Sequence, residues 1–139
     1  MEAGVARIMV VEDDVDLMRI MIHTLQAAGF HVVQTYGGVD ALRKVKLQKP
    51  DLVLTDLAMP GISGVEVIAQ IKGDPETRHI PCIAVTAHIW DHIAQAASQS
   101  GCDSLVPKPF NSVRLLQEVT KYVPLPGKLP ARPVPTGRA

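Results

Sequence analysis

The sequence contains little cysteine and no excess of charge of either sign. Its two cysteines, Cys82 and Cys102, lie far apart, with no C-x-x-C motif and no cluster with histidine. This pattern indicates neither a zinc site nor a disulfide framework, and it favours two buried thiols. The 14 basic and 14 acidic residues leave a formal net charge of zero. No overall electric field therefore attracts nucleic acid or an anionic membrane, and we expect neither as a direct partner.

Long hydrophobic runs are also absent. The apolar run near the N-terminus is too short for a signal peptide and has no basic flank, and no later run approaches membrane-spanning length. With 139 residues, of which 47% are hydrophobic and 20% charged, the chain has the size and composition of one globular domain. We expect a soluble, cytoplasmic protein.

The composition changes after Tyr122 to "VPLPGKLPARPVPTGRA", which is rich in proline and contains basic but no acidic residues. Dense proline favours extended polyproline II, so we predict a domain at 1–123 and a disordered tail at 124–139. A docking segment, an inert terminus and an interdomain linker all fit this tail. No helix-turn-helix or catalytic output sequence follows Tyr122, so a DNA-binding regulator requires a longer chain of which this is the N-terminal fragment.

Short β-branched apolar runs alternate with stretches of helical period along the rest of the chain. This alternation is typical of five successive strand–helix units and a parallel sheet. Several runs are apolar on both faces, as expected for strands covered by helices on each side. The fold class is therefore α/β, a three-layer sandwich. The expected strands are "ARIMVV", "HVVQTY", "DLVLTD", "CIAVTA" and "SLVPK".

Capping residues and helix-ending residues mark the five expected helices. Asp16 is expected to cap the first, which closes at Ala28 and Gly29, and Asn111 is expected to cap the last. The other three are expected at 39–48, from 63 or 64 to 72, and at 90–100.

Reactive groups in an open parallel sheet gather beyond the carboxyl ends of its strands. The first expected strand is followed by Glu12, Asp13 and Asp14, and the third ends in Asp56. Converging carboxylates repel one another by roughly 4 kcal/mol per pair about 4 Å apart at an effective dielectric constant near 20. A hard divalent cation is therefore expected among them. Mg²⁺ fits best, and Mn²⁺ is possible.

Two further groups belong to the same edge of the sheet. Thr86 ends the fourth expected strand with a hydroxyl, and Lys108 ends the fifth with a positive charge. An aspartate can attack phosphorus and form an acyl phosphate while a metal ion and a lysine neutralise the phosphoryl oxygens. The predicted chemistry is phosphoryl transfer to aspartate.

The motifs "VVEDD", "LTDLAMPGISG", "VTA" and "PKPF", in this order and spacing, resemble the receiver domain of two-component response regulators, in the single-domain form of the chemotaxis regulators. The resemblance covers about residues 5 to 123. It implies a flavodoxin-like (βα)5 fold with strand order 2-1-3-4-5. It also implies a phosphoacceptor in a phosphorelay, which is charged by a histidine kinase or histidine phosphotransfer protein and which then switches its binding of a downstream effector protein.

The resemblance also assigns roles to individual residues. It implies that Asp56 is the phosphoacceptor, Thr86 the switch hydroxyl and Lys108 the phosphate-pairing lysine. It implies direct Mg²⁺ binding by Asp13 and binding through water by Glu12, while Asp14 only begins a turn. The other implied features are a metal-facing carbonyl at Ala58, a metal contact of Asp56, a close backbone approach at Gly64 and a cis peptide before Pro109.

One position departs from the family pattern, because Leu105 stands where receivers commonly have an aromatic switch residue. Output is then expected from the loop after Thr86, where His88 lies near the site and Trp90 offers a packing or docking surface. We expect the rim residues Ala58 and His88 to set how readily water reaches the acyl phosphate, and therefore its lifetime. The switch and rim residues are Ala58, Ala87, His88, Leu105 and Pro109.

Two other readings use the same residues. An aspartate-based phosphatase or phosphotransferase needs a lid over its substrate, and the loops here are too short for one. A flavodoxin-like cofactor site needs a phosphate-binding loop after the first strand, where this chain has acids. We therefore expect that the protein is not an enzyme and that its only reactions are Mg²⁺-dependent self-phosphorylation and self-dephosphorylation. Phosphorylation-dependent dimerisation through the fourth and fifth units remains open.

Overall fold

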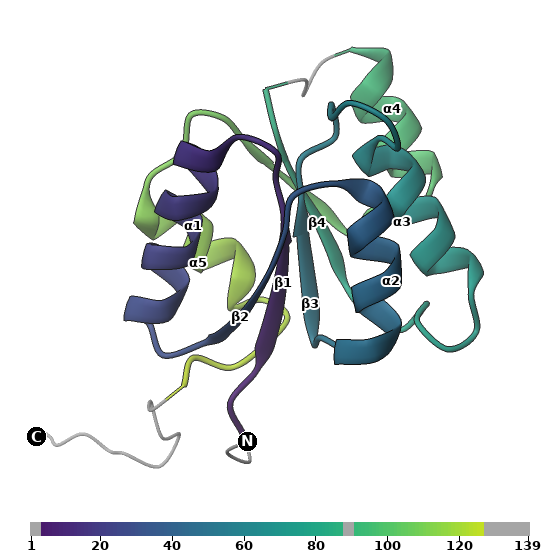
Figure 1. Ribbon diagram of the computed structural model, residues 1–139. Coiled ribbons are helices and arrows are strands. Elements are labelled where there is room, and N and C mark those ends of the chain that lie inside the picture. Colours follow the sequence, from purple (N-terminus) through teal and green to yellow (C-terminus); the bar gives the residue numbers. More distant parts are fainter. Residues whose placement is uncertain (1–3, 88–90, 127–139) are drawn as a thin grey trace, which may run out of the picture.

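The computed structural model describes residues 4–87 and 91–126, in which five strands alternate with five helices (Figure 1). None of the described helices is long and apolar enough to cross a membrane. The strands are β1 (Arg7–Val11), β2 (His31–Thr35), β3 (Leu52–Thr55), β4 (Cys82–Thr86) and β5 (Ser104–Pro107). The helices are α1 (Val15–Ala27), α2 (Gly38–Gln48), α3 (Gly64–Gly73), α4 (His92–Gln99) and α5 (Ser112–Val119).

All five strands are parallel and form one sheet in the order β2-β1-β3-β4-β5. Helices α1 and α5 cover one face, and α2, α3 and α4 cover the other (Figure 1). The predicted α/β sandwich with strand order 2-1-3-4-5 is confirmed. Because the strands are parallel, all their carboxyl ends lie at one edge of the sheet, here called the site edge.

The sheet separates two hydrophobic clusters, and β1 supplies both. Ile8 and Val10 point into the cluster under α1 and α5, whereas Met9 and Val11 point into the cluster under α2, α3 and α4. All four side chains are 0% exposed. The alternation of a strand thus explains why this run is apolar without interruption.

The helix caps correct two of the predicted boundaries. Asp14, not Asp16, caps α1: its Oδ1 accepts hydrogen bonds from the backbone N–H of Asp16 at 2.9 Å and of Leu17 at 3.1 Å. Asp14 has the extended backbone of an N-cap, whereas Asp16 already lies in the first helical turn. Helix α4 begins at His92 with Asp91 as its cap, so the predicted start at position 90 was two residues early. The predicted cap of α5 by Asn111 is confirmed.

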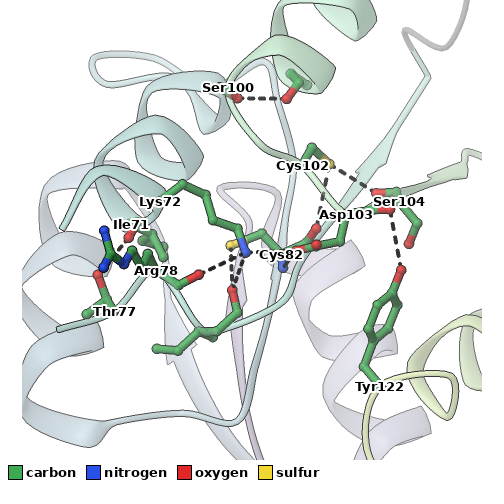
Figure 2. A network of polar contacts seen from close by, with 12 residues as sticks. Ile71, Lys72, Thr77, Arg78, Cys82, Ser100, Cys102, Asp103, Ser104 and Tyr122 are labelled. Carbon is green, nitrogen blue, oxygen red and sulfur yellow. Dashed lines mark hydrogen bonds and ion pairs between the residues drawn. The ribbon is translucent and has the colours of Figure 1, made fainter. Parts of the chain in front are cut away.

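A polar network joins α3, β4 and β5 at the edge of the sheet opposite the site edge (Figure 2). The Lys72 ammonium donates to the Ile80 carbonyl at 2.8 Å and lies 2.9 Å from Asp103 Oδ2. The same Asp103 oxygen accepts the backbone N–H of Cys82 at 2.8 Å. This Lys72–Asp103 network therefore fixes where β4 begins relative to β5.

Both cysteines are free thiols, and the predicted burial is confirmed for Cys82 but not for Cys102, which is half-buried. Cys82 is 0% exposed, and burial raises the pKa of its thiol to about 12. Burial also raises the pKa of the half-buried Cys102. Neither thiol forms a reactive thiolate near neutral pH.

The described chain continues three residues past Val123, into the segment predicted as a tail. Val123 is buried, and Leu125 packs against the cluster under α1 and α5. Pro126 lies against Gly29, where an added Cβ would be 3.1 Å from the proline Cβ. Leu125 and Pro126 thus pack on the domain, while residues 127–139 of the predicted tail lie outside the described residues.

Candidate functional site

The strand ends bring the predicted site residues to the site edge. Glu12 and Asp13 follow β1 directly, and Asp56 follows β3. The backbone N–H of Asp56 donates to the Val11 carbonyl at 3.0 Å, so the sheet ladder places these two chain ends side by side. The backbone N–H of Lys108 donates to the Thr86 carbonyl at 3.0 Å in the same way.

Three carboxylates form a cluster at this edge. One oxygen each from Glu12, Asp13 and Asp56 lies within 4.8 Å of the others. Glu12 is 1% and Asp56 9% exposed, whereas Asp13 is open to solvent. The cluster is therefore a half-enclosed anionic site that is accessible from the Asp13 side.

Lys108 is the cation next to this cluster. Its ammonium lies 3.4 Å from Asp56 Oδ2 and 3.3 Å from Glu12 Oε1. The sequence did not predict the contact with Glu12. Burial raises the pKa of Glu12, and the nearby Lys108 charge opposes that rise. One ammonium is shared by two nearly buried carboxylates.

The donor set fits a hard divalent cation. Among the described residues, Lys108 is the one lysine that pairs with these three carboxylates, which leaves excess negative charge. Carboxylate oxygens are the ligands that Mg²⁺ prefers. Glu12, Asp13 and Asp56 are the residues that can hold such an ion. The part played by the Ala58 carbonyl stays a prediction.

The loop between β3 and α3 packs tightly around Asp56. A Cβ at Gly64 would lie 1.8 Å from the Asp56 carbonyl oxygen, so only glycine fits there, as predicted. The Ala58 side chain is exposed, and its backbone N–H lies 3.4 Å from Asp56 Oδ1. The Thr55 hydroxyl, which the sequence did not single out, donates to the Asp56 carbonyl at 2.8 Å. These contacts orient the backbone that carries the aspartate.

The remaining switch and rim positions differ in accessibility. Thr86 is 0% exposed at the end of β4, whereas the next residue, Ala87, is exposed. Leu105 is half-buried and packs against the cluster under α2, α3 and α4. The peptide bond before Pro109 is cis, as predicted. His88 and Trp90 lie outside the described residues.

Comparison with known proteins places this geometry in a family. The family model described as the response regulator receiver domain matches residues 8–120. The polar-differentiation response regulator DivK of Brucella anthropi is 34% identical over 116 residues, which cover 84% of this chain and 94% of DivK. DivK of Brucella abortus matches at the same identity and coverage.

Solved structures show the same fold. The chemotaxis protein CheY4 of Vibrio cholerae superposes with a TM-score of 0.81 at 25% identity and covers 86% of this chain and 99% of its own. The receiver domain of a Pseudomonas aeruginosa sensor histidine kinase, solved with a magnesium ion coordinated in its active site cleft, superposes with a TM-score of 0.80 at 24% identity, covering 85% of this chain and 97% of its own. From its motifs, sheet order and matched residues, the chain belongs to the response regulator receiver domain family.

Proposed function

We propose that the protein accepts a phosphoryl group on Asp56 from a histidine kinase or a histidine phosphotransfer protein, and that the modified site changes its affinity for a downstream effector protein. The observation that carries the proposal is the Asp56 carboxylate at 3.4 Å from the Lys108 ammonium, inside a cluster of two further carboxylates. Membership of the receiver family supports the same role.

The transfer conserves atoms and electrons. A carboxylate oxygen of Asp56 attacks phosphorus, the P–N bond of the donor phosphohistidine breaks, and its electron pair returns to the imidazole nitrogen. Lys108 then pairs with a phosphoryl oxygen, and the Thr86 hydroxyl can donate to another. Hydrolysis reverses the state, since attack by water on phosphorus restores the carboxylate and releases inorganic phosphate.

Mg²⁺ is part of the proposal, with Mn²⁺ as a possible substitute, and it would be held by Glu12, Asp13 and Asp56. When bound, the ion neutralises phosphoryl charge during the transfer. The magnesium ion in the P. aeruginosa receiver supports this assignment by analogy. The nearly buried Glu12 and the exposed Asp13 differ in access, which fits a water-mediated role for the first and a direct role for the second.

The output is a shift between two conformations rather than turnover of a separate substrate. A bound phosphoryl group carries a charge of about −2, and its contacts favour the state in which Lys108 and Thr86 both engage it. Half-buried Leu105 takes the place of a swinging aromatic ring, so the segment from Thr86 to α4 is expected to transmit the change. A cytoplasmic location belongs to the proposal, because the free thiols Cys82 and Cys102 persist in reducing compartments.

The test is an intact-mass measurement. Wild type incubated with a small phosphodonor and Mg²⁺ should gain one phosphoryl mass that is lost on mild alkaline treatment, and Asp56→Asn should gain none. Asp16→Asn is a matched control, because it changes an exposed carboxylate outside the acidic cluster. An unmodified wild type under these conditions would overturn the proposal.

A further inference from the structure

A groove of about 530 Å³ lies beside the site, between the first turns of α1 and the segment that follows β5. Its floor is apolar, because it is lined by Leu17, Ile20 and Phe110. Ile20 is 55% exposed. The groove is also lined by Asp14, Asp16, Ala87 and Lys108. An apolar surface next to charged groups is typical of a binding site.

The accessible charge on this groove is negative. Lys108 is paired with Glu12 and Asp56, and the Asp14 carboxylate caps α1. The Asp16 side chain, in contrast, is 90% exposed, and its nearest cation in the described chain is Arg19 at 3.8 Å. The groove therefore suits a ligand that combines apolar and basic groups.

The described chain ends near the C-terminal end of α1, whose first turns line the groove. Pro126 packs against Gly29, just beyond the last turn of α1, and the preceding residues run below α1 and α5 (Figure 1). Between Gly29 and the groove lies the seam of α1 and α5, where Thr24 Oγ1 and Ser112 Oγ are 3.5 Å apart. A segment that follows Pro126 thus starts at one end of a surface path to the groove.

The distance from Gly29 to the groove matches the length of the segment that follows Pro126. Twelve helical positions separate Gly29 from Leu17, which is about 18 Å at about 1.5 Å per residue. An extended proline-rich chain covers about 3.1 Å per residue, so about six residues after Pro126 span that path. The sixth residue after Pro126 in the sequence is Arg132, and it is followed by Pro133, Val134 and Pro135.

The charge and the apolar side chains of this segment also match those of the groove. Residues 127–139 contain Lys128, Arg132 and Arg138, no acidic residue, and apolar side chains between the basic ones. We propose that residues 128–135 of this chain bind the groove intramolecularly, with Arg132 paired with Asp16 and Pro133, Val134 and Pro135 covering Leu17, Ile20 and Phe110. Tethering gives the segment an effective concentration on the order of millimolar, so individually weak contacts suffice.

Such binding would act on the site next to it. The groove shares Lys108 and Ala87 with the edge that carries Asp56, so a bound segment covers part of the approach to the phosphoacceptor. A phosphorylated protein donor is large enough to be hindered by a segment that covers the surface beside Asp56, whereas a small phosphodonor is not. The segment would therefore slow transfer from proteins selectively. This consequence rests on the proposed function, but the binding itself does not.

The test compares amide signals of ¹⁵N-labelled full-length protein. Arg132→Glu should shift the signals of Leu17, Ile20 and Phe110, and 0.5 M salt should shift wild type in the same direction, because screening weakens the ion pair. Arg138→Glu is the matched control, since this residue lies six positions beyond the groove contact. The charge-reversed pair Asp16→Arg with Arg132→Glu should restore the Ile20 and Phe110 signals.

Unchanged groove signals in Arg132→Glu would overturn the proposal. Groove signals that depend on protein concentration would also overturn it, because a second copy would then be the occupant. In transfer assays, Arg132→Glu should increase the rate from a phosphohistidine protein severalfold and leave the rate from acetyl phosphate unchanged. If Asp56 is never phosphorylated although the groove signals respond, the proposed function fails and the segment's binding stands.

Discussion

At the scale of single residues, the three acidic side chains after β1 have different surroundings. Glu12 is nearly buried and lies beside Lys108, Asp13 is exposed within the carboxylate cluster, and Asp14 turns back to cap α1. Three adjacent residues of similar chemistry therefore divide into two site residues and one structural residue. Each can be tested by a change that removes charge but keeps shape.

Asp13→Asn should weaken Mg²⁺ binding about tenfold or more, which corresponds to about 1.4 kcal/mol, because it removes a charged oxygen from the cluster. Asp14→Asn should change the affinity by less than about twofold, because asparagine caps a helix as well as aspartate does. Isothermal titration calorimetry with MgCl₂ gives both values. A larger loss in Asp14→Asn would refute the assignment.

Glu118 on α5 provides a test of pH dependence. It is 3% exposed; burial raises its pKa, but hydrogen bonds from Arg114 at 2.7 Å and Lys121 at 3.2 Å outweigh burial, so the pKa is lowered from its ordinary value of 4.5. A lowered pKa means that the ionised group stabilises the fold above pH 4.5 and that this contribution is lost as the pH falls through the folded-state pKa.

The free energy of unfolding of wild type should therefore exceed that of Glu118→Gln at pH 7, and the difference should shrink below pH 4.5. Urea titrations from pH 7 to pH 3 measure it. A difference that stays constant over this range would show that the carboxylate charge contributes nothing.

At the scale of elements, the turn from β3 into α3 depends on the absence of a side chain at Gly64. A Cβ added at Gly64 would lie 1.8 Å from the Asp56 carbonyl oxygen, so Gly64→Ala must displace the backbone of Asp56. We expect a loss of at least about 2 kcal/mol in unfolding free energy, together with slower phosphorylation. Gly73→Ala, in the same helix, has no atom within 4 Å of the added Cβ and should be tolerated. Equal stability of the two variants would contradict the close approach.

The elements also show what a sequence can and cannot predict. Alternation of apolar runs and helical periods was sufficient for the order of strands and helices, because burial on both faces of a sheet leaves a strong pattern. The cap of α1 was misassigned because both Asp14 and Asp16 satisfy the composition of a cap, and only the backbone angles after β1 decide between them. The Lys108–Glu12 contact joins two residues that are 96 positions apart and depends on the conformations of both side chains, so no local sequence pattern encodes it.

At the scale of the whole molecule, the two edges of the sheet carry different kinds of polar group. At the site edge, three carboxylates lie near one lysine in the described chain. At the opposite edge, the Lys72 ammonium is paired with the Asp103 carboxylate and donates to carbonyl oxygens. Excess charge without a partner can bind a ligand of opposite charge, whereas a fully paired polar network makes the structure around it more rigid. The opposite edge is therefore expected to stay fixed while the site edge responds.

Lys72→Met tests this division. It leaves the Asp103 carboxylate and the Ile80 carbonyl without their cationic partner, so the free energy of unfolding should fall by about 2 kcal/mol. Mg²⁺ affinity should be unchanged, because the network lies at the far edge. Lys46→Met removes an exposed lysine paired with Asp74 and should leave stability nearly unchanged. If Lys72→Met altered Mg²⁺ affinity at full stability, the two edges would be coupled.

The span between Glu12 and Lys108 has a consequence for the newly made chain. Their contact joins positions 96 residues apart, and Lys108 enters only when β5 completes the sheet. Before that, Asp56 lies in a chain that lacks its lysine, so under the proposed function an emerging or partly unfolded chain would not present the acceptor in its complete site. If Asp56 is the acceptor, as proposed, only molecules whose folding is complete would take part in signalling.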